Sequence, residues 1–119
     1  MKAFIFLALI AACAAGDYAR YENFDVDELI NNRRLLISYS GCFQGGKCTP
    51  EGNDFKKWIP EAMQTSCGDC TEHQKRMVAK VMVALKEKLP NDWVKLTEKY
   101  NKDHKYDESL NKFLEEFGH

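Results

Sequence analysis

The amino-acid sequence predicts an all-α protein, a single domain of six helices with two short-range disulfides. Three observations lead to this fold class. After residue 24, apolar residues recur at spacings of three and four, which places them on one face of a helix. Capping residues and prolines divide this pattern into segments of helical length. No segment alternates between apolar and polar residues for long enough to predict a strand.

The first two helices are predicted between residues 25 and 43. Asp25 can cap a helix N-terminus, Glu28 can complete a capping box, and Phe24 can pack onto Leu29 as a hydrophobic staple. Helical spacing then continues until glycines break it. The apolar positions of this second stretch are Leu35, Leu36, Tyr39 and Phe43.

The third helix is predicted to start at Thr49, because threonine is a good N-cap and the following Pro50 suits the first helical position. Pro60 should kink this helix without ending it, and Gly68 marks its end. Its apolar face consists of Phe55, Trp58, Ile59, Ala62 and Met63.

The fourth helix follows Thr71, which can form a capping box with Gln74. Val83 and Ala84 widen its apolar face, so this helix is predicted to pack on more than one side. The main face runs through Met77, Val78, Val81, Met82, Leu85 and Leu89.

Two shorter helices complete the prediction. Pro90 ends the fourth helix, and Asn91 and Asp92 can start a fifth, which carries an apolar face of Trp93, Leu96 and Tyr100. After a polar stretch, Asp107 can cap a sixth helix. That helix presents Leu110, Phe113, Leu114 and Phe117 on one face.

Length and charge limit the classes of function. With 119 residues the chain is the size of one domain, which excludes two independent catalytic domains. Lys and Arg number 17 and Asp and Glu 18, so the basic excess of a nucleic-acid-binding protein is missing. Apolar residues make up 45% of the chain and charged residues 29%, which favours a folded globule over disorder.

The first sixteen residues have the pattern of a secretory signal peptide. Lys2 is followed by an apolar run of about ten residues, and the small residues Ala14 and Gly16 precede a cleavage site after Gly16. A membrane-spanning helix needs about twenty apolar residues, and no stretch of the chain reaches that length. We therefore expect residues 1–16 to be removed and residues 17–119 to form a secreted domain with no membrane span.

Four cysteines stay in the mature chain after Cys13 leaves with the signal peptide. An even number in an oxidising compartment predicts two disulfides, for which three connectivities are possible. The spacing favours the local pairs Cys42–Cys48 and Cys67–Cys70, because residues this close in a turn can reach the Cα distance of a disulfide. A structural zinc site and a redox pair are less favoured alternatives. Only Cys67–Cys70 has the spacing of a zinc knuckle, and the βαβ pattern of redox proteins is missing.

Catalytic motifs are missing from the sequence. It contains no Gly-x-Ser-x-Gly elbow, no glycine-rich phosphate loop and no His-Glu-x-x-His. The histidines at 73, 104 and 119 lie among charged residues and are expected on the solvated surface. A basic run on the fourth helix indicates either an anionic partner or, more commonly, a solvated helix face. It comprises Lys75, Arg76, Lys80, Lys86 and Lys88. We expect no enzyme, no metal and no cofactor.

Four segments carry a family resemblance. They are residues 21–28, with their opening tyrosine, and residues 32–36, 47–52 and 67–75. Together they resemble the insect chemosensory proteins, the insect pheromone-binding family of A10/OS-D type, and the similarity extends to Tyr100. That family separates its four cysteines by six, eighteen and two residues. This chain has gaps of five, eighteen and two, so its first disulfide loop is one residue shorter.

The resemblance implies a secreted six-helix bundle around a hydrophobic channel, with two local disulfides, which binds long-chain lipids or odorants and has neither activity nor metal. From the residues alone, a solid core would explain the apolar faces equally well. We expect a monomeric carrier of small hydrophobic molecules. The alternative is an extracellular interaction protein in development, immunity or cuticle, in which the pocket is incidental. A membrane-active protein of saposin type fits less well, because the charge is nearly balanced and the bridges are local.

Ligand-binding positions also follow from the resemblance. Tyr39 matches a tyrosine that lines the channel, Trp93 matches a tryptophan near its mouth, and Tyr21 matches an opening tyrosine close to the same mouth. Trp58 matches no family position and is expected to serve in ordinary packing. The apolar lining positions implied by the match are Ile59, Met63, Val81, Met82 and Leu85.

Overall fold

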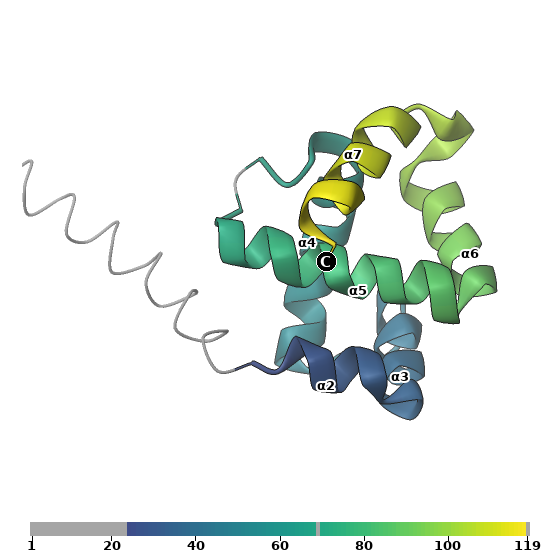
Figure 1. Cartoon of the computed structure of the whole chain (residues 1–119). Helices are drawn as coiled ribbons and strands as arrows, with labels where there is room; N and C mark the ends of the chain where they lie inside the picture. Colours follow the sequence, from purple (N-terminus) through teal and green to yellow (C-terminus); the bar gives the residue numbers. More distant parts are fainter. Residues whose placement is uncertain (1–23, 69, 119) are drawn as a thin grey trace, which may run out of the picture.

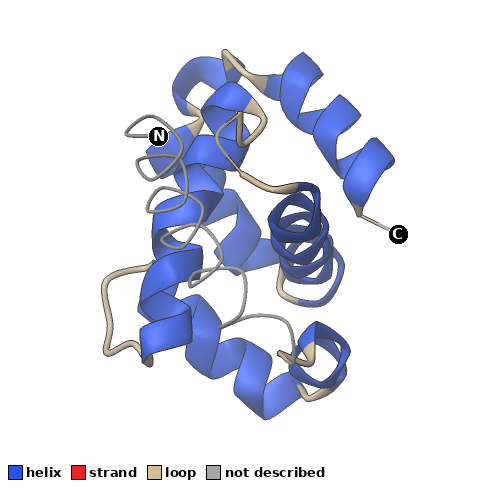
Figure 2. Ribbon diagram, turned by 90° about the vertical axis from the view of Figure 1, so that its left-hand side faces the viewer, coloured by secondary structure: helices blue, strands red, loops and turns tan. Residues whose placement is uncertain are grey.

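The computed structural model describes residues 24–68 and 70–118. The predicted signal peptide, Tyr21 and His119 lie outside these residues. The described residues form six α-helices and one short 3-10 helix, with no strand among them (Figure 2), which confirms the predicted all-α fold. In chain order they are α2 (Val26–Asn31), α3 (Arg33–Phe43), α4 (Pro50–Thr65), α5 (Glu72–Lys88), α6 (Pro90–Tyr100), η1 (Lys102–His104) and α7 (Asp107–Phe117).

Helix α5 is the central element of the bundle. It runs across the middle of Figure 1, with α2 and α3 on one side and α6 and α7 on the other, and it contacts α2, α4, α6 and α7. Its widened apolar face explains this position, because Ala84 is buried and Val83 half-buried beside the main apolar row. The prediction that this helix packs on more than one side is confirmed.

The predicted N-terminal caps fix where three helices begin. Asp25 accepts a hydrogen bond from the Glu28 backbone N–H at 3.0 Å, and Thr49 accepts one from Gly52 N–H at 3.0 Å. Thr71 and Gln74 form the full capping box, with distances of 3.1 and 2.8 Å. Each bond satisfies a backbone donor that the first helical turn leaves unpaired.

Some of the predicted helix ends differ from the structure. Pro90 follows the end of α5, as predicted, but it is itself the first residue of α6, so the start predicted at Asn91 and Asp92 was wrong. The cap position Leu89 makes no side-chain hydrogen bond. Asp107 is the first residue of α7, not its cap, and its carboxylate accepts a hydrogen bond from the Asn101 side chain at 2.6 Å. Helix α4 continues through Pro60, as expected, but ends before Gly68, because Ser66 adopts a left-handed conformation with φ of 56°.

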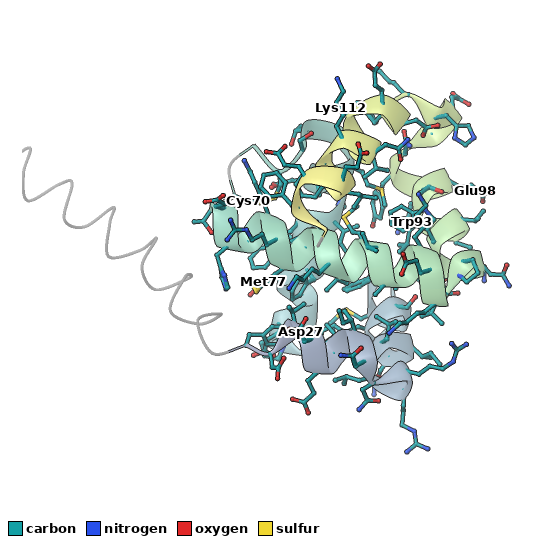
Figure 3. The ribbon with its side chains drawn as sticks, in the orientation of Figure 1. Asp27, Cys70, Met77, Trp93, Glu98 and Lys112 are labelled. Atoms are coloured by element: carbon teal, nitrogen blue, oxygen red, sulfur yellow. A yellow bond between two sulfur atoms is a disulfide. The ribbon has the colours of Figure 1, made fainter. Side chains whose placement is uncertain are left out.

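Both predicted disulfides form between neighbouring cysteines. Cys42–Cys48 joins the end of α3 to the loop before α4, with Cα atoms 4.9 Å apart. Cys67–Cys70 closes the loop between α4 and α5, with Cα atoms 5.3 Å apart, and Cys70 is marked in Figure 3. The shorter gap between Cys42 and Cys48 therefore still accommodates a bridge. Both bridges constrain helix junctions and leave distant segments unlinked.

Every α-helix contributes to one buried apolar core. Among its fully buried members are Leu29 from α2, Leu36 and Phe43 from α3, Phe55 from α4, Val78 from α5, Leu96 from α6 and Phe113 from α7. In the described part of the chain, no helix combines the length and apolar character that crossing a bilayer requires.

Replacing Cys42 and Cys48 together with alanine is expected to lower the free energy of unfolding by about 2 kcal/mol, because a bridge that closes so short a loop removes little entropy from the unfolded chain. Urea unfolding followed by circular dichroism measures this change. The helical signal of the folded variant should match that of the parent. A variant that loses its helical signal in buffer would contradict the local role of this bridge.

Candidate functional site

Five of the predicted ligand-binding residues meet in the core between α4 and α5. Ile59 and Met63 come from α4 and are at most 1% exposed. Val81, Met82 and Leu85 come from α5 and are 0% exposed. All five belong to the same buried apolar cluster. An apolar ligand that reached them would have to displace or rearrange packed side chains.

Tyr39 lies on α3 beside the start of α4. Its side chain is 8% exposed, and its hydroxyl accepts a hydrogen bond from the Thr49 hydroxyl at 3.4 Å. Its ring meets Phe43 edge-on, with ring centroids 6.2 Å apart. A buried phenol needs a polar partner, and the cap residue of the next helix supplies it. Tyr39 thus presents an apolar ring and a polar tip at the junction of two helices.

A small cavity of about 70 Å³ adjoins this tyrosine. It is lined by Leu35, Ser38, Tyr39, Cys42, Lys47, Thr49 and Gly52. Ligand pockets of proteins commonly measure about 300–1,000 Å³, so this space is too small to hold a long alkyl chain. Residues that carry polar side-chain groups are among those that line it, namely Ser38, Tyr39, Lys47 and Thr49.

The two tryptophans lie in different surroundings. Trp93 is half-buried on α6 and packs against the core (Figure 3). Trp58 is half-buried on α4, where its ring meets Phe55 edge-on at 5.4 Å, and Phe55 in turn lies 5.8 Å from Phe24. Trp58 therefore belongs to an aromatic cluster, as its ordinary packing role predicts. The position of Tyr21 stays a prediction, since it lies outside the described residues.

Sequence reasoning missed a polar contact between α3 and α6. Ser40 is 0% exposed, and its hydroxyl donates a hydrogen bond to Asp92 Oδ2 at 2.9 Å. The Gln44 side-chain amide donates to the Ser40 hydroxyl at 3.1 Å and to the Ser40 carbonyl at 3.3 Å. The position of Ser40 in the sequence was the available signal for this contact. Ser40 directly follows Tyr39 and lies one turn after Leu36, so it is buried together with the apolar face of α3.

Two larger grooves lie beside α5. One of about 360 Å³ is lined mainly by residues of α5 and α2, and one of about 570 Å³ mainly by residues of α5 and α7. Charged side chains line much of both grooves, namely Asp27, Lys80, Lys86, Glu87, Lys88 and Glu115. None of the predicted ligand-binding residues that the structure describes lines either groove. We therefore place the candidate site in the interior, with Tyr39 and Trp93 towards its edge.

Most of the basic run on α5 has partners within the protein. Lys75 lies 5.6 Å from the centroid of the Phe117 ring, Arg76 pairs with Glu72 at 3.0 Å, Lys80 lies 3.7 Å from Asp27, and Lys88 donates to the Ile30 carbonyl at 2.6 Å. These contacts tie α5 to itself, to α2 and to α7. They favour the solvated-face interpretation over an anionic partner.

Possible metal ligands come together once in the described part of the chain. Glu61, Cys67 and Cys70 place one ligand atom each within 4.8 Å of one another. Both sulfur atoms are joined in the disulfide, so neither is a thiolate that could bind a metal. This cluster gives the oxidised protein no metal-binding chemistry.

The chain is similar in sequence to known insect proteins. The model of the insect pheromone-binding family, A10/OS-D, matches residues 18–108. Ejaculatory bulb-specific protein 3 of Drosophila melanogaster is 39% identical over 106 residues, which cover 87% of this chain and 84% of that protein.

Two solved structures share the fold. The antennal chemosensory protein A6 from the moth Mamestra brassicae aligns with a TM-score of 0.69 and 31% identity, over 83% of this chain and 93% of the moth chain. A chemosensory protein in complex with bromo-dodecanol aligns with a TM-score of 0.65 and 32% identity, over 78% of this chain and 95% of that chain.

Two isoleucines test whether the candidate site is packed. Ile59→Ala is expected to lower the free energy of unfolding by about 2–5 kcal/mol, because Ile59 is 1% exposed and truncation leaves a cavity. Ile37→Ala is the matched control; Ile37 is 48% exposed, and its loss should cost less than about 1 kcal/mol. Urea unfolding measures both. Equal, small costs would mean that Ile59 already faces empty space.

Proposed function

Because the chain belongs to the insect pheromone-binding family, A10/OS-D, we propose that it is a secreted carrier that binds small hydrophobic molecules, such as odorants or fatty-acid-like lipids, in its apolar interior. The observation that carries this proposal is the likeness to a chemosensory protein in complex with bromo-dodecanol. That ligand belongs to the other protein. A long alkyl chain with one polar end is the corresponding ligand class for this chain.

The composition of the interior supports this ligand class. The residues between α4 and α5 offer only apolar atoms, and two of the proposed contacts, Met63 and Met82, are methionines. Methionine adapts its shape to irregular apolar partners, which suits a carrier that accepts several ligands. Apolar burial contributes about 25 cal/mol per Å², so a long acyl chain that enters this space could reach micromolar affinity.

The polar end of the ligand needs a different environment. The Tyr39 hydroxyl and the Trp93 indole N–H are proposed to orient it, with Tyr21 as a third contact at the mouth. Tyr39 is suited to this role because its hydroxyl interacts with Thr49 while its ring stays buried. Binding of this kind needs no bond making or breaking, so we propose no catalytic residue, cofactor or metal.

Secretion of a monomer is part of the proposal. The signal-peptide pattern of residues 1–16 and the two disulfides both suit an extracellular compartment. Residues 17–119 would then be the mature carrier. Local bridges at helix junctions leave the helices able to separate, as ligand entry into a packed interior requires.

An apolar ligand is expected to raise the melting temperature of the mature chain. Ligand that binds only the folded state adds about 2.7 kcal/mol at one hundred times its dissociation constant, which corresponds to a rise of roughly 10 °C or more for a domain of about 100 residues. Calorimetry with alcohols, acids and esters of ten to eighteen carbons measures the rise. A melting temperature that none of them moves would favour the interaction-protein alternative.

The two tryptophans separate the proposed mouth from the aromatic cluster. Trp93→Phe is expected to abolish most of the fluorescence change caused by ligand, whereas Trp58→Phe should leave it nearly intact. Tyr39→Ala should weaken binding in either background, because it removes ring area and a hydroxyl. Fluorescence titration with dodecanol measures all three. Loss of the signal in the Trp58 variant would place the entrance on the Phe55 side instead.

A further inference from the structure

The Ser40–Asp92 hydrogen bond holds the start of α6 against α3. It joins residues that are 52 positions apart in the chain, and its donor is 0% exposed. Among the described residues, no other side-chain hydrogen bond links α3 to α6. A hydrogen bond to a charged group is among the stronger polar contacts in a protein.

The surrounding groups fix the direction of this bond. The Gln44 amide can only donate from its nitrogen, and it donates to the Ser40 oxygen at 3.1 Å. The Ser40 proton is therefore directed towards Asp92. Asp92 lies in the first turn of α6, where the helix dipole favours a negative charge. The N-cap residue of this helix is Leu89, whose side chain makes no hydrogen bond to the first turn.

Helix α6 is fastened at both ends by different contacts. At its C-terminal end, the Gln64 side chain from α4 donates to the Tyr100 carbonyl at 3.0 Å. At its N-terminal end, the Ser40–Asp92 bond makes the connection to α3. Breaking the second contact would leave α6 held by Gln64 at its far end and joined to α5 through the buried Leu89, so its first turn could shift relative to α3 by turning about that junction.

That first turn carries one side of the proposed ligand entrance. Asp92 is followed by Trp93, and Ser40 is preceded by Tyr39. The hydrogen bond thus sets the separation of the two backbone segments that carry these aromatic rings.

We propose that the Ser40–Asp92 hydrogen bond is a latch that controls how fast a ligand enters and leaves between α3 and the start of α6. This inference rests on the proposed carrier function. Ser40 and Asp92 are positioning residues, since they act through Tyr39 and Trp93 and make no contact with the ligand. The latch closes the entrance in the free and the loaded protein alike. Its loss therefore speeds entry and exit together and leaves the affinity nearly unchanged.

Stopped-flow fluorescence with bromo-dodecanol tests the latch, because bromine quenches tryptophan. In a Trp58→Phe background, Trp93 is the remaining tryptophan of the two in the chain. Ser40→Ala and Asp92→Ala should each raise the association and dissociation rates by about tenfold or more, as expected for a lost hydrogen bond to a charged group. The dissociation constant should stay within about twofold. Unchanged rates, or a rise in the dissociation rate alone, would overturn the proposal.

A matched control separates the latch from a general loss of stability. Ser109→Ala removes a serine hydroxyl that donates to the Tyr106 carbonyl at 3.1 Å, at a helix start away from α3. This variant should keep parental rates. Should Ser40→Ala fail to fold, Gln44→Ala keeps both latch residues and removes the amide that orients the hydroxyl. Its rates should rise in the same direction by a smaller factor, and parental rates in Gln44→Ala would then overturn the proposal.

Acrylamide quenching of Trp93 without ligand distinguishes failure of the latch from failure of the carrier function. In the Trp58→Phe background, Ser40→Ala and Asp92→Ala should raise the quenching constant about twofold over the Ser109→Ala control. If the parent binds no bromo-dodecanol, the carrier function fails, and this measurement still decides whether the bond holds α6 against α3. Equal quenching in all variants would overturn the latch whether or not the ligand binds.

Discussion

The fold depends on burying the apolar surface of α5 on several sides at once. Val78, Val81, Met82 and Leu85 are all 0% exposed, and the helices that cover them come from both ends of the chain. A helix with an apolar face this wide needs neighbours around it to remove that face from water. The same demand creates an apolar interior, which is the property that a carrier of hydrophobic molecules needs. Stability and proposed function therefore draw on one set of side chains.

Two buried polar side chains give this apolar bundle a defined geometry. Ser40 connects α3 to α6, and Asn101, at 3% exposure, connects the end of α6 to α7 through Asp107 and the Tyr106 backbone. Apolar contacts tolerate sliding, whereas a buried hydrogen bond is satisfied in few arrangements. Both polar contacts involve α6. The position of that helix, and of Trp93 on it, is thus set by polar contacts as well as by packing.

The sequence was sufficient for the helices and the disulfides because their signals are local. Thr49 and Thr71 cap helices through bonds three residues away, and the cysteine pairs close short loops. The helix ends that depend on distant partners could not be predicted from neighbouring residues alone. Asp92 and Asp107 have the chemistry of caps, but Ser40 and Asn101 bind their carboxylates instead. The burial of Ser40 likewise depends on α6, which lies far along the chain.

For the candidate site, helical spacing correctly predicted that Ile59 and Met82 face the interior. A periodic pattern cannot distinguish a residue that lines a ligand site from one that is packed in a core.

The most direct test of an interior carrier site is to measure nuclear Overhauser effects between dodecanol and methyl groups of the mature chain. We expect contacts from the alkyl chain to Met63, Met82 and Leu85. Contacts confined to Val83 and Ala84, in the groove between α5 and α2, would place the ligand on the surface and contradict an interior carrier site.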